Sequence, residues 1–253
     1  MLITASEIIN KSWTLYQKNY RVIAHYLLLL FIPTGLMAIA SVIIGSFTAV
    51  FLTFGLGVPL IVYLAMGLLA SIASLWLSIS LMRAIYSFYL GSTTKSLKEN
   101  LQTSLQLIWP AILISLVSSL IIFGGLLLLI IPGLMLIIWL AFSFYAVILD
   151  NQRVTDSLST SRNLVRGRWW AVLWRLIAPA AVFGIFLFLL QWLISIPIEL
   201  ILRNFTEGNL VYTVLLAFFT LIGVITSLLF TPLSSAAIII LYQELKNTPA
   251  EKV

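Results

Sequence analysis

Long apolar runs, separated by short polar connections, dominate the pattern along the chain. Six of these runs are near the roughly 20 residues that a helix needs to cross about 30 Å of hydrocarbon. The third is typical, because fifteen of the residues from Ala111 to Ile131 are Leu, Ile, Val or Phe. Backbone polar groups find no water in lipid, so such runs must be helical, and none alternates as a membrane β-strand does. The pattern predicts an all-α, polytopic transmembrane helical bundle of about six spans: 22–44, 58–82, 108–130, 133–149, 171–196 and 210–233, the last with a helical extension to 245.

Shorter amphipathic stretches precede the first, third and fifth spans. In each, four positions at offsets 0, 4, 7 and 11 line one helical face. Basic and aromatic residues share these stretches with apolar ones, which predicts three cytoplasmic interfacial helices. Whether each helix begins a repeated unit completed by a transmembrane hairpin stays open, because any amphipathic helix gives this spacing. The positions are Ile9, Trp13, Tyr16 and Tyr20; Leu97, Leu101, Ser104 and Ile108; and Leu158, Arg162, Val165 and Trp169, with Arg162 interrupting the stripe.

Composition strengthens the membrane prediction and removes several other classes. Apolar residues make up 62% of the 253 positions and charged residues only 9%, whereas soluble domains are nearer half apolar and a quarter charged. The chain has no cysteine, which excludes disulfides, thiolate metal sites and cysteine catalysis. The net charge of +6 does not indicate nucleic-acid binding, because the basic residues stand at the ends of apolar runs.

The basic residues also predict the orientation. With the N-terminus inside, thirteen Lys and Arg residues are cytoplasmic and only Arg203 is outside. We therefore expect a multi-pass membrane protein with both termini in the cytoplasm. Residues 1–253 are expected to form one membrane domain: an interfacial helix (1–21), spans one to four (22–149), a basic cytoplasmic segment (150–170), spans five and six (171–245) and a polar tail (246–253). Within it, Ile131, Pro132 and Gly133 predict a tight turn between the third and fourth spans.

The basic segment carries the most distinctive chemistry. Guanidinium groups grip phosphate oxygens in two places at once, and tryptophan rings prefer the headgroup layer. The segment therefore favours contacts with anionic lipid headgroups. A simpler alternative stays open, namely that the arginines only set the orientation of the neighbouring spans and the tryptophans belong to the aromatic belt at the membrane surface. The candidate contacts are Arg153, Arg162, Arg166, Arg168, Trp169, Trp170 and Arg175.

Other polar residues in the spans favour structural roles. Gln191 is the most deeply placed strong hydrogen-bonding side chain, and we expect it to contact another helix. The single histidine, His25, lies near the predicted cytoplasmic interface without the partners of a metal site or a proton relay. No acidic pair, phosphate-binding loop or catalytic triad is visible. We therefore predict no enzymatic activity, no metal and no cofactor.

A set of residues in the middle of the chain forms a recognisable pattern. The residues are Ile131-Pro132-Gly133, Trp139, Phe142, Val147-Ile148, Asp150, Ser157-Leu158, Ser161, Leu164, Arg166-Gly167 and Trp169-Trp170, with Trp13, Tyr16, Tyr20 and Pro33 nearer the N-terminus. The pattern resembles the membrane domain attached to some glycerophosphoryl diester phosphodiesterases, and related uncharacterised prokaryotic six-helix proteins. Ser157 departs from it, since relatives often have alanine there. In those phosphodiesterases the chemistry belongs to a separate soluble barrel, so the resemblance implies a membrane domain, in the plasma (inner) membrane of a prokaryote, and no mechanism.

Two functions remain in view. The first is a non-enzymatic membrane protein that organises anionic lipids or partner proteins through its basic cytoplasmic face. The second is a transporter of small solutes or lipids, or a flippase-like protein, which six spans and helix prolines favour but which usually needs a polar midplane site. Membrane lipids are the expected partners, a protein partner or a homo-oligomer stays open, and nucleic acid is not expected.

Overall fold

A computed structural model describes residues 2–46, 55, 57–92, 96–206 and 209–248, and these residues contain helices and no strand. By length and composition, six helical stretches are able to cross a membrane, with α6 and α7 together forming one of them. The predicted all-α bundle is therefore confirmed. The helices are α1 (Ala5–Ser46), α3 (Gly57–Tyr89), α4 (Leu97–Leu105), α5 (Ile108–Leu128), α6 (Ile130–Leu140), α7 (Ser143–Asp150), α8 (Val154–Val165), α9 (Trp169–Leu202) and α10 (Leu210–Asn247).

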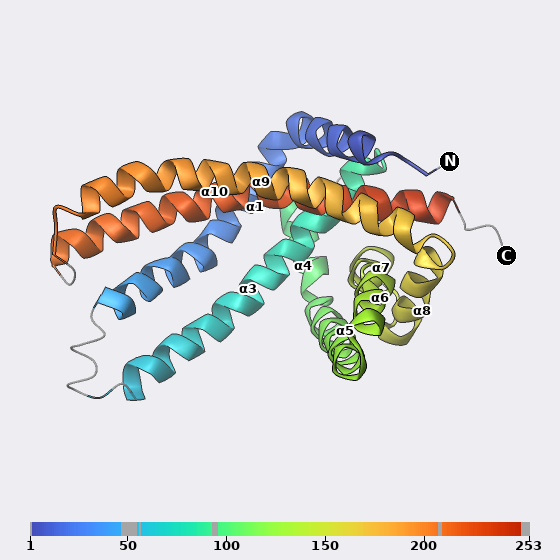
Figure 1. Cartoon of the computed structure of the whole chain (residues 1–253), viewed down its shortest axis with the longest axis horizontal. Coiled ribbons are helices and arrows are strands. Elements are labelled where there is room, and N and C mark those ends of the chain that lie inside the picture. The colour runs from blue at the N-terminus through green and yellow to red at the C-terminus, as the bar shows by residue number, and fades with distance from the viewer. Residues whose placement is uncertain (1, 47–54, 56, 93–95, 207–208, 249–253) are drawn as a thin grey trace.

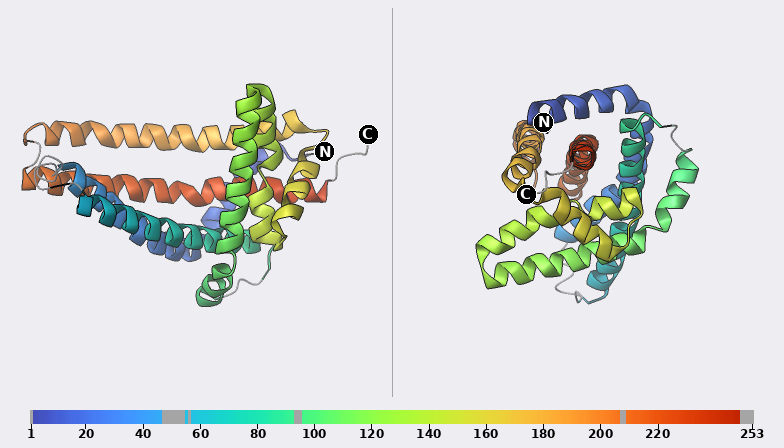
Figure 2. Two further views of the ribbon diagram at one scale, coloured as in Figure 1. Left: turned by 90° about the horizontal axis from the view of Figure 1, so that it is seen from below. Right: turned by 90° about the vertical axis from the view of Figure 1, so that its right-hand side faces the viewer.

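The long helices spread apart from one end of the molecule, and the α5–α6 hairpin lies across α9 and α10. Helices α9 and α10 run side by side along the length of the molecule, while the later part of α1 and α3 run obliquely to them (Figure 1). Figure 2 shows α5 and α6 side by side and crosswise to α9 and α10. Helix α10 packs against α1, α3 and α9, and so occupies the centre of the long-helix group.

The start of α1 and the C-terminal end of α10 lie at one end of this group, together with α7 and α8 (Figure 1). We call this the basic end, and we call the end formed by Ser46, Gly57, Leu202 and Leu210 the loop end. The buried core belongs to the basic end, where α10 buries most positions from Pro232 to Leu245. Towards the loop end, α3 buries no residue before Leu77 and α9 none after Phe183. Exposed apolar surface on this scale needs lipid to cover it.

The short amphipathic helices are present as predicted. The first forms the N-terminal part of α1 and is separated from the rest by Asn19, whose backbone leaves the helical region (φ −116°, ψ 16°). The Asn19 side chain donates to the Leu15 carbonyl oxygen at 2.9 Å, and the helix changes direction there. The other two are α4 and α8, which precede α5 and α9. Figure 2 shows the N-terminal part of α1 lying across the long helices at the basic end.

The turn between the third and fourth spans falls earlier than predicted. Leu129 alone is extended (φ −158°, ψ 141°) and separates α5 from α6. Pro132 lies in the first turn of α6, where its missing N–H has no helical partner to lose. Gly133 permits a close approach and not the reversal itself, because a Cβ atom there would lie 2.8 Å from the Leu126 Cα. The prediction of a turn at residues 131–133 was therefore wrong by two or more residues.

The fourth span is also divided, where the sequence predicted a continuous run over 133–149. Helix α6 ends at Leu140 and α7 begins at Ser143. The Ser161 hydroxyl of α8 donates to the Trp139 carbonyl oxygen at 2.6 Å and accepts from the Phe142 N–H at 3.0 Å. A side chain distant in sequence thus satisfies backbone groups at the break, which hydrophobic periodicity cannot reveal.

Candidate functional site at the basic end

The carboxylates of Asp150 and Glu244 join helices at the basic end through hydrogen bonds and ion pairs. The Asp150 carboxylate accepts from the Tyr242 hydroxyl at 2.5 Å and from Lys246 Nζ at 2.8 Å, joining α7 to α10. The Glu244 carboxylate accepts from Lys11 Nζ at 3.1 Å and from the Tyr89 hydroxyl at 2.9 Å, joining α10 to α1 and α3. Each carboxylate is paired with a lysine, so both act here as connections between helices.

Arg168, one of the predicted lipid contacts, is bound to backbone carbonyls. Its Nε donates to Leu164 O at 2.8 Å, its Nη2 to Leu245 O at 2.9 Å, and its Nη1 to Thr248 O. The side chain therefore closes the C-terminal end of α10, where free carbonyls favour a cation. Burial among these groups lowers the pKa of the Arg168 guanidinium.

Arg175 binds the start of the chain in the same way. Its Nε donates to Ile3 O at 2.5 Å and its Nη2 to Leu2 O at 3.4 Å, while Nη1 donates to Ala171 O at 2.8 Å within α9. The guanidinium thus holds the N-terminal residues against α9. Three of the five N–H donors of each guanidinium are occupied, so Arg168 and Arg175 are less available to phosphate than the sequence suggested.

The other three arginines of the predicted set are exposed, and we call Arg153, Arg162 and Arg166 the exposed arginine set. The Arg162 guanidinium lies 5.2 Å from the centre of the Trp139 ring, and no hydrogen bond or ion pair joins the other two side chains to any described residue. The three flank or belong to α8, which begins directly after Arg153 and ends directly before Arg166.

The predicted tryptophans also divide. Trp170 is 76% exposed, and Trp174, one turn further along α9, is 65% exposed. Trp169 packs edge-on against Trp170 at 4.7 Å between ring centres, and its Nε1 points to the Met135 carbonyl oxygen at 3.5 Å. Trp170 therefore offers its ring to the surroundings, while Trp169 connects α9 to α6.

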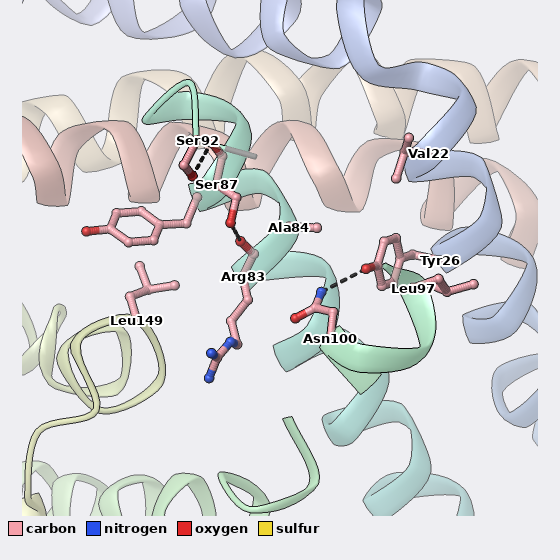
Figure 3. A pocket seen from close by; sticks show the side chains of 10 residues that line it. Val22, Tyr26, Arg83, Ala84, Ser87, Ser92, Leu97, Asn100 and Leu149 are labelled. Atoms are coloured by element: carbon pink, nitrogen blue, oxygen red, sulfur yellow. Dashed lines mark hydrogen bonds between the residues drawn. The ribbon is translucent and has the colours of Figure 1, made fainter. Parts of the chain in front are cut away.

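A cavity that sequence reasoning missed lies between α1, α3, α4 and α7. Its volume is about 230 Å³. Figure 3 shows the Arg83 side chain extending from α3 between Leu149 on one side and Asn100 on the other. No hydrogen bond or ion pair joins this guanidinium to any residue in the described ranges. The lining residues are Val22, Tyr26, Arg83, Ala84, Tyr86, Ser87, Ser92, Leu97, Asn100 and Leu149.

Asn100 positions α4 beside this cavity. It is 5% exposed, and its amide nitrogen donates to the Tyr26 hydroxyl at 2.7 Å and to the Ser80 carbonyl oxygen at 2.8 Å. The Trp76 indole donates to the Leu101 carbonyl oxygen at 2.8 Å, a second attachment of α4 to α3. From the sequence, Arg83 indicated only which end of its span faces the cytoplasm. The cavity was not predicted, because α4 returns onto α3 through these long-range hydrogen bonds.

The remaining polar predictions concern Gln191 and His25. The Gln191 amide donates to the Ser227 hydroxyl at 2.8 Å, which confirms the expected interhelical contact between α9 and α10. His25 is exposed, and its Nδ1 lies 2.7 Å from the Arg21 carbonyl oxygen. Among the described residues, no group of three His, Asp or Glu side chains is placed to hold a metal ion.

Comparison of the chain with protein-family models, with curated proteins and with solved structures found no match. The resemblance to the phosphodiesterase membrane domain therefore stays a prediction. Two of its residues, Asp150 and Ser161, have structural partners here that explain their chemistry without a ligand. What the six long apolar helices establish is that the chain is an integral membrane protein.

Proposed function

We propose that this membrane protein binds anionic lipid headgroups at the cytoplasmic face of a prokaryotic plasma membrane and organises lipids or partner proteins there, without catalysing a reaction. The observation that carries the proposal is the exposed arginine set beside the exposed ring of Trp170. Guanidinium groups suit phosphate oxygens, and an indole suits the headgroup layer.

The distribution of charge supports a cytoplasmic basic end. Described lysines and arginines gather on the helices and connections of that end, whereas Arg203 follows the last residue of α9 at the loop end. Short loops rich in lysine and arginine stay on the cytoplasmic side of bacterial membranes. The same leaflet presents anionic lipids to the exposed arginine set.

The magnitude of the attraction follows from the number of free guanidinium groups. Each basic residue near an anionic surface contributes about 1 kcal/mol. Three exposed arginines therefore supply about 3 kcal/mol, or roughly a hundredfold preference for an anionic over a neutral surface. Arg168 and Arg175 add less, because their donors already bind carbonyl oxygens.

The test replaces all three members of the exposed arginine set by glutamine. Native mass spectrometry of the protein, released from vesicles containing equal amounts of phosphatidylglycerol and phosphatidylcholine, counts the lipids of each kind that stay bound. We expect the variant to lose its preference for phosphatidylglycerol, whereas Arg203→Gln at the loop end keeps it. An unchanged preference in the triple variant contradicts the proposal.

Transport is the second candidate function, and one cavity favours it. A space of about 570 Å³ lies between α1, α9 and α10 and is lined in part by Thr34, Gln191, Thr220 and Ser227. The three hydroxyl groups and the Gln191 amide each donate a hydrogen bond within the bundle, for example from Thr34 to Leu30 O at 2.7 Å. Purified protein in liposomes should move labelled lipid or solute faster than protein-free liposomes if this candidate holds.

A further inference from the structure

We infer that the cavity around Arg83 binds a phosphate group, carried either by a lipid headgroup or by a free phosphate anion. This site is separate from the exposed arginine set and does not rest on the function proposed for that set. Its walls come from α1, α3, α4 and α7, and no member of the exposed arginine set lines it. The inference rests on the charge of Arg83, on the form of the cavity and on its place in the bundle.

Arg83 carries a positive charge that no described side chain balances. Its guanidinium is half-buried and has no partner among the described residues. The two carboxylates that meet at the basic end are already paired, Asp150 with Lys246 and Glu244 with Lys11. A cation removed from water without a counter-ion is unfavourable. An anion in the cavity would therefore be held by a charge that the protein leaves uncompensated.

The cavity has donors and a size that suit a phosphate group. A guanidinium offers paired N–H donors that match two phosphate oxygens at once. The Ser87 hydroxyl donates to Arg83 O at 3.0 Å and the Ser92 hydroxyl to Ser87 O at 3.2 Å (Figure 3). Serine hydroxyls rotate to suit their surroundings, so either is able to turn toward a ligand. At about 230 Å³, the cavity is below the roughly 300–1,000 Å³ of pockets for drug-sized ligands, which favours a single phosphate group over a nucleotide.

The cavity lies at one end of the apolar lengths of α1 and α3. Arg83 lies near the end of the apolar length of α3, and Val22 and Tyr26 mark the start of the apolar length of α1. Basic pockets between transmembrane helices at this level suit lipid headgroups. Asn100 has both amide hydrogens committed to Tyr26 and Ser80, so it shapes the wall and does not donate to the ligand. The fold thus places an unpaired guanidinium in a walled space at headgroup depth.

The experiment measures binding to the full-length protein by native mass spectrometry after exchange into detergent. One arm titrates inorganic phosphate, and the other titrates short-chain phosphatidic acid. We expect a single tight site in the wild type that weakens at least about tenfold in Arg83→Gln. Arg83→Lys should weaken it less, since it keeps the charge but loses the paired donors. Arg21→Gln, which removes an exposed charge at the same end, should leave the site unchanged.

A second variant guards against misfolding of Arg83→Gln. Ser87→Leu keeps Arg83 and the net charge but fills part of the cavity, and it should also weaken the site. Binding of phosphatidic acid alone identifies a lipid headgroup as the source, and binding of inorganic phosphate that the lipid does not displace identifies a free anion. Absence of a single tight site in the wild type, or equal binding in wild type and both variants, overturns the inference. Because lipid held in the Arg83 cavity would add to the lipid count that tests the exposed arginine set, that count is also made with Arg83→Gln present, which separates the two sites.

Discussion

The Ser161 hydroxyl gives the sharpest test of how the broken fourth span is held. Ser161→Ala removes the acceptor of the Phe142 N–H and the donor to the Trp139 carbonyl oxygen. Both Ser161 and Phe142 are fully buried, so water does not replace the lost hydroxyl. Each buried polar group left without a partner costs about 1–3 kcal/mol. Two such groups lose their partner, so we expect Ser161→Ala to lower the free energy of unfolding by about 2–6 kcal/mol.

The measurement is reversible unfolding of the purified protein in mixed micelles with increasing sodium dodecyl sulfate, followed by circular dichroism. Ser159→Ala is the matched control, because its exposed hydroxyl donates only to the Asp156 carbonyl oxygen in the same helix at 2.8 Å. The control should change the unfolding free energy by less than about 0.5 kcal/mol. Equal unfolding of the Ser161 variant and the control would refute the view that this hydroxyl joins α6 to α7.

Three further predictions use other parts of the molecule. Gly133→Val should destabilise the protein by about 1–3 kcal/mol, because α5 and α6 must separate to admit the side chain. Gly124→Val is the control, since a Cβ atom there would meet nothing within 4 Å, and the same unfolding assay should show no such loss of stability. Because the chain has no cysteine, a membrane-impermeant maleimide should label Arg203→Cys in intact cells and Arg166→Cys only after permeabilisation; the reverse result would invert the orientation. Asp150→Asn, which weakens a charged contact to two side chains of α10, should lower the unfolding free energy by about 1–3 kcal/mol, and an unchanged value would mean that the contact contributes nothing.

The long helices were predictable because one physical requirement dominates them. Hydrocarbon forces each long apolar run to satisfy its own backbone, and α5 indeed begins at the predicted Ile108. The ends of the runs were less predictable, since Leu129 has no turn signal and interrupts the helix inside an unbroken apolar sequence. Pro132 and Gly133 stood out in the sequence, but their roles are a helix start and a close contact.

The candidate site was predictable in composition and not in detail. The sequence located the arginines and tryptophans of the basic segment, but not which of them stay free. Arg168 binds a carbonyl oxygen 77 residues away, and Arg175 binds one 172 residues away. Such bonds depend on where distant backbone ends meet, which local spacing does not encode. The Arg83 cavity was missed for the same reason, since α4 closes it through Asn100.

The concentration of the buried core at the basic end has a mechanical consequence. Pro232–Leu245 of α10 lies in a densely packed environment, while the parts of α3 and α9 near the loop end bury no side chain. The long helices are held by side-chain packing at the basic end, and lipid chains supply most of their lateral support at the loop end. A force applied at the loop end should therefore separate the helices there at low load, and a larger load should be needed to unfold the packed basic end. Changes in lateral membrane pressure should alter the helix positions at the loop end first.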